Sequence, residues 1–109
     1  MLERAIEVAL FCHVSQVDKN DEASILHPLR VMLTVRERGG TIEQQAAAVL
    51  HDVIEDCGVT DEFLADRLPE TDCDLVDALT HQDEEDYQGF IRRVCIVPGA
   101  RLIKEADSR

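Results

Sequence analysis

Four ionisable residues lie close together at the end of the segment 46–58, which reads AAAVLHDVIEDCG. They are His51, Asp52, Glu55 and Asp56, and the glycine that follows them is a common helix terminator. Carboxylates near a helix C-terminus oppose the partial negative charge there, at a cost of a few tenths to about 1 kcal/mol each. Neighbouring carboxylates also repel one another unless a positive charge lies between them. A bound divalent cation would relieve both costs, so this segment is a candidate metal site.

A helix over this segment separates the ionisable side chains from the apolar ones. At about 100° per residue, His51, Glu55, Asp52 and Asp56 fall at roughly 0°, 40°, 100° and 140°. The sequence therefore predicts a polar face with one histidine, opposite a buried stripe. A solvated acidic face is the alternative interpretation of the same pattern. The predicted buried stripe consists of Ala46, Leu50, Val53, Ile54 and Cys57.

An adjacent histidine and aspartate supply one imidazole nitrogen and one carboxylate oxygen. This mixed set of donor atoms suits Mn²⁺, Fe²⁺ or Zn²⁺ better than Ca²⁺. Two ligands do not complete a metal site, so further ligands must come from other elements. The candidates are His13, His27, His81 and acidic residues elsewhere in the chain.

The elements that must position these groups are predicted to be helices. The first covers LERAIEVALFCHV, where Leu2, Ile6, Ala9, Leu10 and Val14 recur at helical spacing. The second, 27–38, carries a proline in its first turn, where proline is tolerated, and two glycines close it. A capping-box pattern of Thr and Gln at 41 and 44 starts the third helix, which runs to about residue 58.

The second half of the chain continues the helical pattern. A fourth, short helix starts at Thr60 and ends near Leu68, and a fifth, DCDLVDALT, is capped by Thr71. A sixth, DYQGFIRRVCIV, is weakened by its glycine, and Pro98-Gly99 separates it from a final ARLIKEAD. Alternation with a period of two is found nowhere over a useful length. The fold class is therefore predicted to be all-α, an irregular bundle of about six or seven short helices.

Length and composition limit the classes of protein. A chain of 109 residues, 45% hydrophobic and 31% charged, is expected to form one folded domain over residues 1–109. A net charge of −12 argues against nonspecific binding to nucleic acid or an anionic membrane. We find neither a signal peptide nor a stretch long enough to span a bilayer. Composition leaves the oligomeric state open.

The four cysteines indicate the compartment. They are widely spaced and form no CxxC pair, which favours reduced, mostly buried thiols in a cytoplasmic protein. A structural zinc site on these cysteines is the alternative, and their spacing gives it little support.

The chain resembles the HD-domain phosphohydrolases in four segments taken in order. These segments read ILHPLRV, AAAVLHDVIEDCGVT, LVDALT and ARLIKEAD, and they extend over nearly the whole chain. More narrowly, the chain is similar to the hydrolase domain of the RelA/SpoT group and its small stand-alone relatives. Those enzymes act in the stringent response and remove the 3′-pyrophosphate of guanosine tetraphosphate (ppGpp) or pentaphosphate in a Mn²⁺-dependent reaction. The resemblance implies a hydrolase with a small-molecule nucleotide substrate.

The resemblance also implies a role for particular residues. Four of them would ligate the metal, which the resemblance implies is Mn²⁺: His27, His51, Asp52 and Asp107. Glu55 and Asp56 match the pair that positions and deprotonates the attacking water. Lys19 and Lys104 are candidates for contacts with substrate phosphates. The family continues into a further helix, so the domain is expected to lack a C-terminal helix.

Two other functions stay open at this point. In the loop before His27, Ser15, Asp21, Ala23 and Ser24 replace the Gly, Gly, Pro and Tyr that are usual in the family. Another nucleotide or phosphoester is therefore an alternative substrate for the same metal and water. A catalytically silent HD domain, acting as a nucleotide-binding regulatory module, is the alternative from a different functional class.

Overall fold

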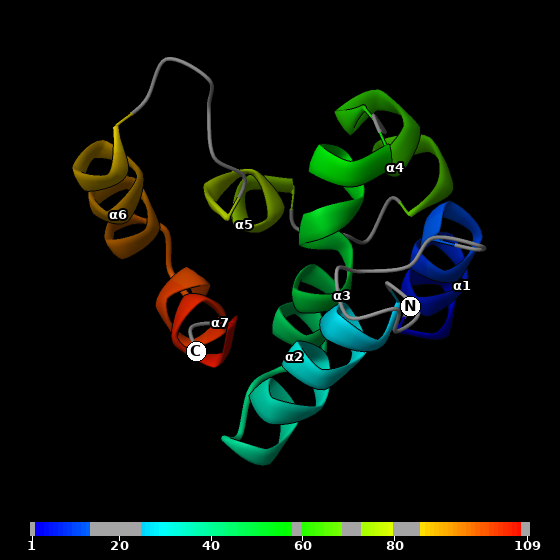
Figure 1. Ribbon diagram of the computed structural model, residues 1–109, viewed down its shortest axis with the longest axis horizontal. Coiled ribbons are helices and arrows are strands. Elements are labelled where there is room, and N and C mark those ends of the chain that lie inside the picture. Colours follow the sequence, from blue (N-terminus) through cyan, green and yellow to red (C-terminus); the bar gives the residue numbers. More distant parts are fainter. Residues whose placement is uncertain (1, 14–24, 58–59, 69–72, 80–85, 108–109) are drawn as a thin grey trace.

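The computed structural model describes residues 2–13, 25–57, 60–68, 73–79 and 86–107 (Figure 1). For residues 52–57, 61, 73 and 74 it describes the backbone alone. The described residues form helices joined by turns and contain no strand, so the all-α prediction is confirmed. The helices are α1 (Leu2–His13), α2 (Leu26–Glu37), α3 (Ile42–Cys57), α4 (Asp61–Arg67), α5 (Cys73–Ala78), α6 (Tyr87–Ile96) and α7 (Ala100–Asp107).

Helix α3 is the centre of the bundle. It packs against α1, α2, α5 and α7, with α1 on one side of it and α5 and α7 on the other (Figure 1). Every residue from Gln45 to His51 is buried. The three consecutive alanines 46–48 have small side chains, which lets neighbouring helices approach closely on several sides. His51 is among these buried residues, so the side of α3 that carries it is covered at this level, and the alternative of a solvated face is wrong for His51.

Helix α1 buries a narrower stripe than its apolar pattern predicted. Ala5, Ala9 and His13, spaced four residues apart, are buried against the core. Leu10, which the pattern assigned to the inner face, is 50% exposed. His13 is buried, and neither of its ring nitrogens has a hydrogen-bond partner among the described residues.

Two glycines end α2 and fix its angle to α3. Gly39 has a φ of 85°, the left-handed conformation that glycine adopts without a steric cost. Its N–H donates to Arg36 O, and the Gly40 N–H donates to Val35 O at 2.8 Å. This pair of bonds is the Schellman arrangement that satisfies the last carbonyls of a helix. The predicted end of the second helix is thereby confirmed.

The start of α3 is fixed by the predicted capping box. The Gln44 N–H donates to Thr41 Oγ1 at 3.1 Å, and the Thr41 N–H donates to Gln44 Oε1 at 2.8 Å. Gln44 also donates through Nε2 to the Gly99 carbonyl at 3.1 Å. Gly99 lies in the turn just before α7, so this bond ties the start of α3 to the start of α7. It helps to set the position of α7 beside α3.

Other predicted features have mixed outcomes. Thr60 caps α4 by accepting from the Phe63 N–H, as predicted, and Asp86 caps α6 by accepting from the Gly89 N–H. Cys95 is exposed and Cys12 is half-buried, so the prediction of mostly buried thiols is wrong for Cys95. The predicted cap at residue 71, the histidine at 81 and most of the acidic loop that follows it lie outside the described residues.

Candidate metal and active site

The first contact of the candidate site joins helices α2 and α7. His27 lies in the first turn of α2, and its Nε2 is 2.7 Å from Oδ1 of Asp107, the last residue of α7. The two residues are 80 positions apart in the sequence. The side chains of His27 and Asp107 are 33% and 22% exposed, so solvent reaches the pair from one side. This geometry matches a hydrogen bond in which the imidazole donates and the carboxylate accepts.

His51 approaches the same carboxylate from α3. Its side chain is 5% exposed, and its Nδ1 lies 2.7 Å from the Ala48 carbonyl oxygen. A carbonyl only accepts, so Nδ1 carries the hydrogen and the neutral ring has its lone pair on Nε2. That Nε2 lies 3.7 Å from Oδ2 of Asp107. A histidine oriented by a carbonyl at one nitrogen is the usual arrangement of a metal ligand at the other.

Asp107 is ionised at neutral pH. When Nε2 of His51 carries a proton, its hydrogen bond and positive charge, followed by those of His27, lower the pKa of the Asp107 carboxyl from 3.8 to about 2, against the opposing effect of partial burial. An ionised carboxylate facing the lone pair of a neutral imidazole is stabilised by a proton or a cation between them. The pair of His51 and Asp107 therefore has the electrostatics of a cation site.

The donor set fits a divalent metal. Two ligand atoms that each lie about 2.1 Å from one ion are about 3.0–3.4 Å apart. The two imidazole-to-carboxylate distances, 2.7 and 3.7 Å, lie on either side of that separation. Among the side chains that the structure describes, no three His, Cys, Asp or Glu already form a group able to hold an ion. Small shifts of His27 and His51, and a further ligand, would complete the coordination.

The other predicted site residues are placed less fully. Positions 52, 55 and 56 lie on the last turns of α3, after His51, but their side chains are outside the described residues, as is the whole of Lys19. Lys104 is half-buried on α7, three residues before Asp107 and therefore on a neighbouring part of the same helix face. The structure thus brings together His27, His51 and Asp107, with Lys104 one turn away on α7.

The sequence did not predict the contact between Lys104 and the aromatic ring of Phe90. The Lys104 ammonium lies 5.3 Å from the centroid of the buried Phe90 ring, and the Arg93 guanidinium lies 5.7 Å from the same centroid. Arg93 also donates to the Asp77 carbonyl near the end of α5. The spacing of Phe90 and Arg93 shows that they share one face of α6, but no sequence pattern shows that α7 packs there.

A family model matches most of this chain. The family model described as HD domain matches residues 5–89, which include His27, His51 and the acidic positions that follow it on α3. The match covers more than half of the chain, which therefore belongs to the HD domain family. Membership supports a hydrolase that uses a divalent metal.

Individual relatives narrow the comparison. The chain is 39% identical over 98% of its length to a probable GTP pyrophosphokinase of Mycobacterium leprae. It is 33% identical over 97% of its length to a guanosine-3′,5′-bis(diphosphate) 3′-pyrophosphohydrolase of Aquifex aeolicus, and 36% identical over 76% to one of Vibrio cholerae. The chain spans only 15%, 16% and 12% of these three relatives. It corresponds to the hydrolase-type domain of the RelA/SpoT group within much longer proteins.

The described helices also bear on membrane association. None of them is both long enough and apolar enough to cross a bilayer.

Proposed function

We propose that this chain is a phosphohydrolase that removes the 3′-pyrophosphate of guanosine 3′,5′-bis(diphosphate), with Mn²⁺ as its metal. The observation that carries the proposal is the convergence of His27 and His51, from separate helices, on the two oxygens of the Asp107 carboxylate. In this proposal His27, His51, Asp52 and Asp107 hold the ion. A mixed nitrogen and oxygen donor set of this kind suits Mn²⁺, Fe²⁺ or Zn²⁺.

The chain's own residues prepare the site before any ligand binds. The Ala48 carbonyl fixes the ring of His51 and keeps its lone pair on Nε2. The hydrogen bond from His27 fixes the orientation of the Asp107 carboxylate. The burial of His51 keeps water away from one side of the cluster. Ligands held in this way lose little conformational freedom on binding, which favours tight and selective metal binding.

The hydrolytic step needs a base and a cationic environment for phosphate. A bound divalent ion would supply Lewis acidity, which lowers the pKa of a coordinated water and stabilises negative charge on phosphoryl oxygens. We assign Glu55 and Asp56 to orienting the attacking water and accepting its proton, since both follow His51 on α3. Lys104, one turn before Asp107, and Lys19 are assigned to the phosphates of the substrate.

The names of the relatives include both pyrophosphokinases and pyrophosphohydrolases. The cluster favours hydrolysis, because histidines and carboxylates around a metal are suited to activating water. The altered loop before His27 keeps another nucleotide or phosphoester as an alternative substrate, and a panel of nucleotides should accompany ppGpp in the assay.

The test is the release of pyrophosphate from ppGpp by the purified chain with Mn²⁺, beside a sample in EDTA. We expect turnover that EDTA abolishes and that returns when Mn²⁺ is restored. Turnover that is insensitive to EDTA would exclude a metal mechanism. A chain that binds Mn²⁺ but releases neither pyrophosphate nor phosphate from any nucleotide of the panel would exclude the hydrolase and favour a binding module.

Two variants separate the ligand role from the water-handling role. Asp52→Ala should remove both Mn²⁺ binding, measured by calorimetry, and turnover. Glu55→Gln should keep Mn²⁺ binding within about threefold and lower kcat by roughly 10²–10⁴, the usual contribution of a general base. Loss of Mn²⁺ binding in both variants would contradict this division. Glu105→Gln, an exposed change on α7, is the matched control and should change neither readout.

A further inference from the structure

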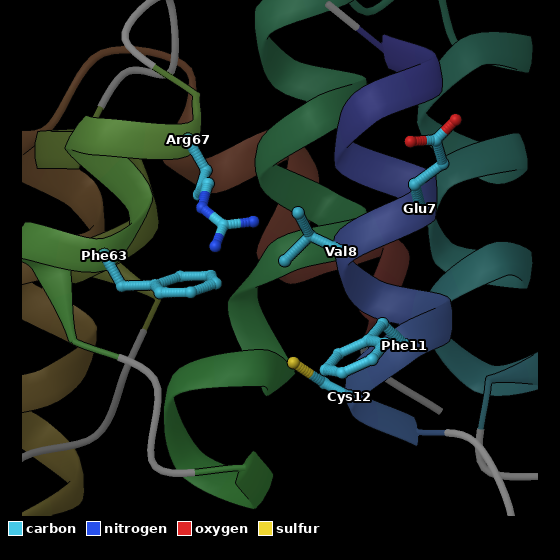
Figure 2. A pocket seen from close by; sticks show the side chains of 6 residues that line it. All are labelled: Glu7, Val8, Phe11, Cys12, Phe63 and Arg67. Atoms are coloured by element: carbon cyan, nitrogen blue, oxygen red, sulfur yellow. The ribbon is translucent and has the colours of Figure 1, made fainter.

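A half-open cavity of about 380 Å³ lies between α1 and α4, on the other side of α3 from α7. Figure 2 shows its walls: Phe63 and Arg67 extend from α4, and Val8, Phe11 and Cys12 from α1. None of these residues belongs to the cluster around Asp107. Small-molecule pockets span about 300–1,000 Å³, so the size suits a ligand of one or two rings.

Aromatic rings stand on both sides of this cavity. Phe63 and Phe11 are 36% and 78% exposed, although burying such large apolar side chains would stabilise the protein. Figure 2 shows the Phe63 ring on one wall and the Phe11 ring on the other, with the Cys12 sulfur directed into the space between them. A planar ring placed there could make offset-stacked or edge-to-face contacts with both phenylalanines.

A single cation lies among the described lining residues. The Arg67 guanidinium lies 5.0 Å from the centroid of the Phe63 ring and reaches toward Val8 (Figure 2). Among the described residues no carboxylate forms an ion pair with Arg67. Glu7, at the far edge of the cavity, directs its carboxylate away from Arg67 (Figure 2). No described carboxylate competes for the N–H groups of Arg67, so they can donate to an anion that also contacts the rings.

We propose that the cavity between α1 and α4 is a binding site for a small planar aromatic anion. The ring system lies between Phe63 and Phe11, and its carboxylate, sulfonate or phosphate accepts hydrogen bonds from Arg67. Apolar walls with one guanidinium favour an aromatic anion over a purely inorganic one, which would contact Arg67 but gain nothing from the rings. This site is separate from the proposed hydrolase site, and its occupancy does not depend on metal.

The test uses a matched pair of fluorescent probes in EDTA. The anion is 1-anilinonaphthalene-8-sulfonate, and N-phenyl-1-naphthylamine has the same ring systems without the sulfonate. We expect saturable 1:1 binding of the sulfonate to the folded chain. Arg67→Gln should raise the dissociation constant of the sulfonate at least about tenfold, which corresponds to the loss of one charge-assisted hydrogen bond. The dissociation constant of the neutral probe should change less than about twofold. Phe63→Leu should weaken both probes by about two- to tenfold.

Controls make the outcome decisive. Arg92→Gln changes an exposed arginine on α6 and should leave both probes unaffected. Arg67→Lys keeps the positive charge and should retain more sulfonate binding than Arg67→Gln, which a merely structural role would not predict. Displacement of the sulfonate by salicylate would identify an aromatic carboxylate as the ligand class, and displacement by guanosine 5′-monophosphate an aromatic phosphate.

Three results would overturn the proposal. One is the absence of saturable sulfonate binding to the folded chain. Another is an equal effect of Arg67→Gln on both probes. The last is a fluorescence signal that follows self-association of the chain in sedimentation, because a second copy would then cover Phe11. Circular dichroism of each variant confirms that the helices are intact.

Discussion

Replacing Asp107 by asparagine tests the site through stability rather than activity. In the metal-free protein the change removes the charge from a carboxylate that accepts a hydrogen bond from His27 and faces His51. A hydrogen bond to a charged group contributes about 1.5–3 kcal/mol and a neutral one about 0.5–1.5 kcal/mol. The asparagine oxygen can still accept from His27, so the expected loss is about 1.5 kcal/mol. Removing a negative charge from the C-terminus of α7 also relieves an unfavourable interaction with the helix dipole, which adds about 0.5 kcal/mol to the free energy of unfolding.

The net expectation in EDTA is therefore a loss of about 1 kcal/mol in the free energy of unfolding. Adding Mn²⁺ at 100 times the dissociation constant should stabilise the wild-type protein by about 2.7 kcal/mol. If the change at Asp107 weakens Mn²⁺ binding a hundredfold, the variant gains only about 0.4 kcal/mol under the same conditions. The difference between the two proteins should then grow from about 1 to about 3 kcal/mol.

Urea unfolding followed by circular dichroism measures all four states. Glu105→Gln is the matched control, since Glu105 is exposed on the same helix and pairs with the exposed Arg101. It should cost less than about 0.5 kcal/mol with or without Mn²⁺. Equal stabilisation of wild type and Asp107→Asn by Mn²⁺ would refute the ligand role of Asp107. Equal stability of the two in EDTA would refute the energetic value of its bond to His27.

Four further changes test how the fold positions the site. Gly40→Ala should cost about 2–3 kcal/mol, because the new Cβ overlaps the buried Val35 side chain and comes within 2.9 Å of its carbonyl oxygen. In Gly39→Ala the new Cβ meets open space, so the change should cost only about 1 kcal/mol, because alanine is strained at this positive φ. Thermal unfolding in which Gly39→Ala is the more destabilising of the two glycine changes would contradict the packing at this turn. Thr41→Ala should cost about 1 kcal/mol in urea unfolding by removing the cap of α3, and an unchanged midpoint would count against the cap. Leu50→Ala should cost about 3 kcal/mol, since the side chain is fully buried, and a loss below 1 kcal/mol in the same assay would mean that α3 is not central.

Helix boundaries could be predicted from the sequence because capping is local. The hydroxyl of Thr41 and the amide of Gln44 meet across one turn wherever that helix lies in the fold. The same holds for Thr60 at the start of α4 and for Gly39 at the end of α2. Capping satisfies backbone groups within the first or last turn of a helix, so it requires only residues that are neighbours in the sequence.

Burial could not be predicted in the same way, because it depends on how many neighbours a helix has. Helical periodicity gave α3 one buried face, whereas packing on several sides also buries His51. The same periodicity assigned Leu10 to the core, but α1 contacts its neighbours along a narrower stripe. Periodicity states which side chains share a face and says nothing about how many faces are covered.

The sequence by itself indicated an all-α fold and a resemblance to a family of metal-dependent hydrolases. Residue types and spacing left the partners of His51 open among several histidines and acids, and the resemblance to that family selected His27 and Asp107. Only the tertiary structure placed these side chains within hydrogen-bonding distance across 80 residues. The reason is that contacts between α2, α3 and α7 depend on tertiary packing, which no local sequence pattern encodes. The cavity lined by Arg67 likewise results from how α1 and α4 pack.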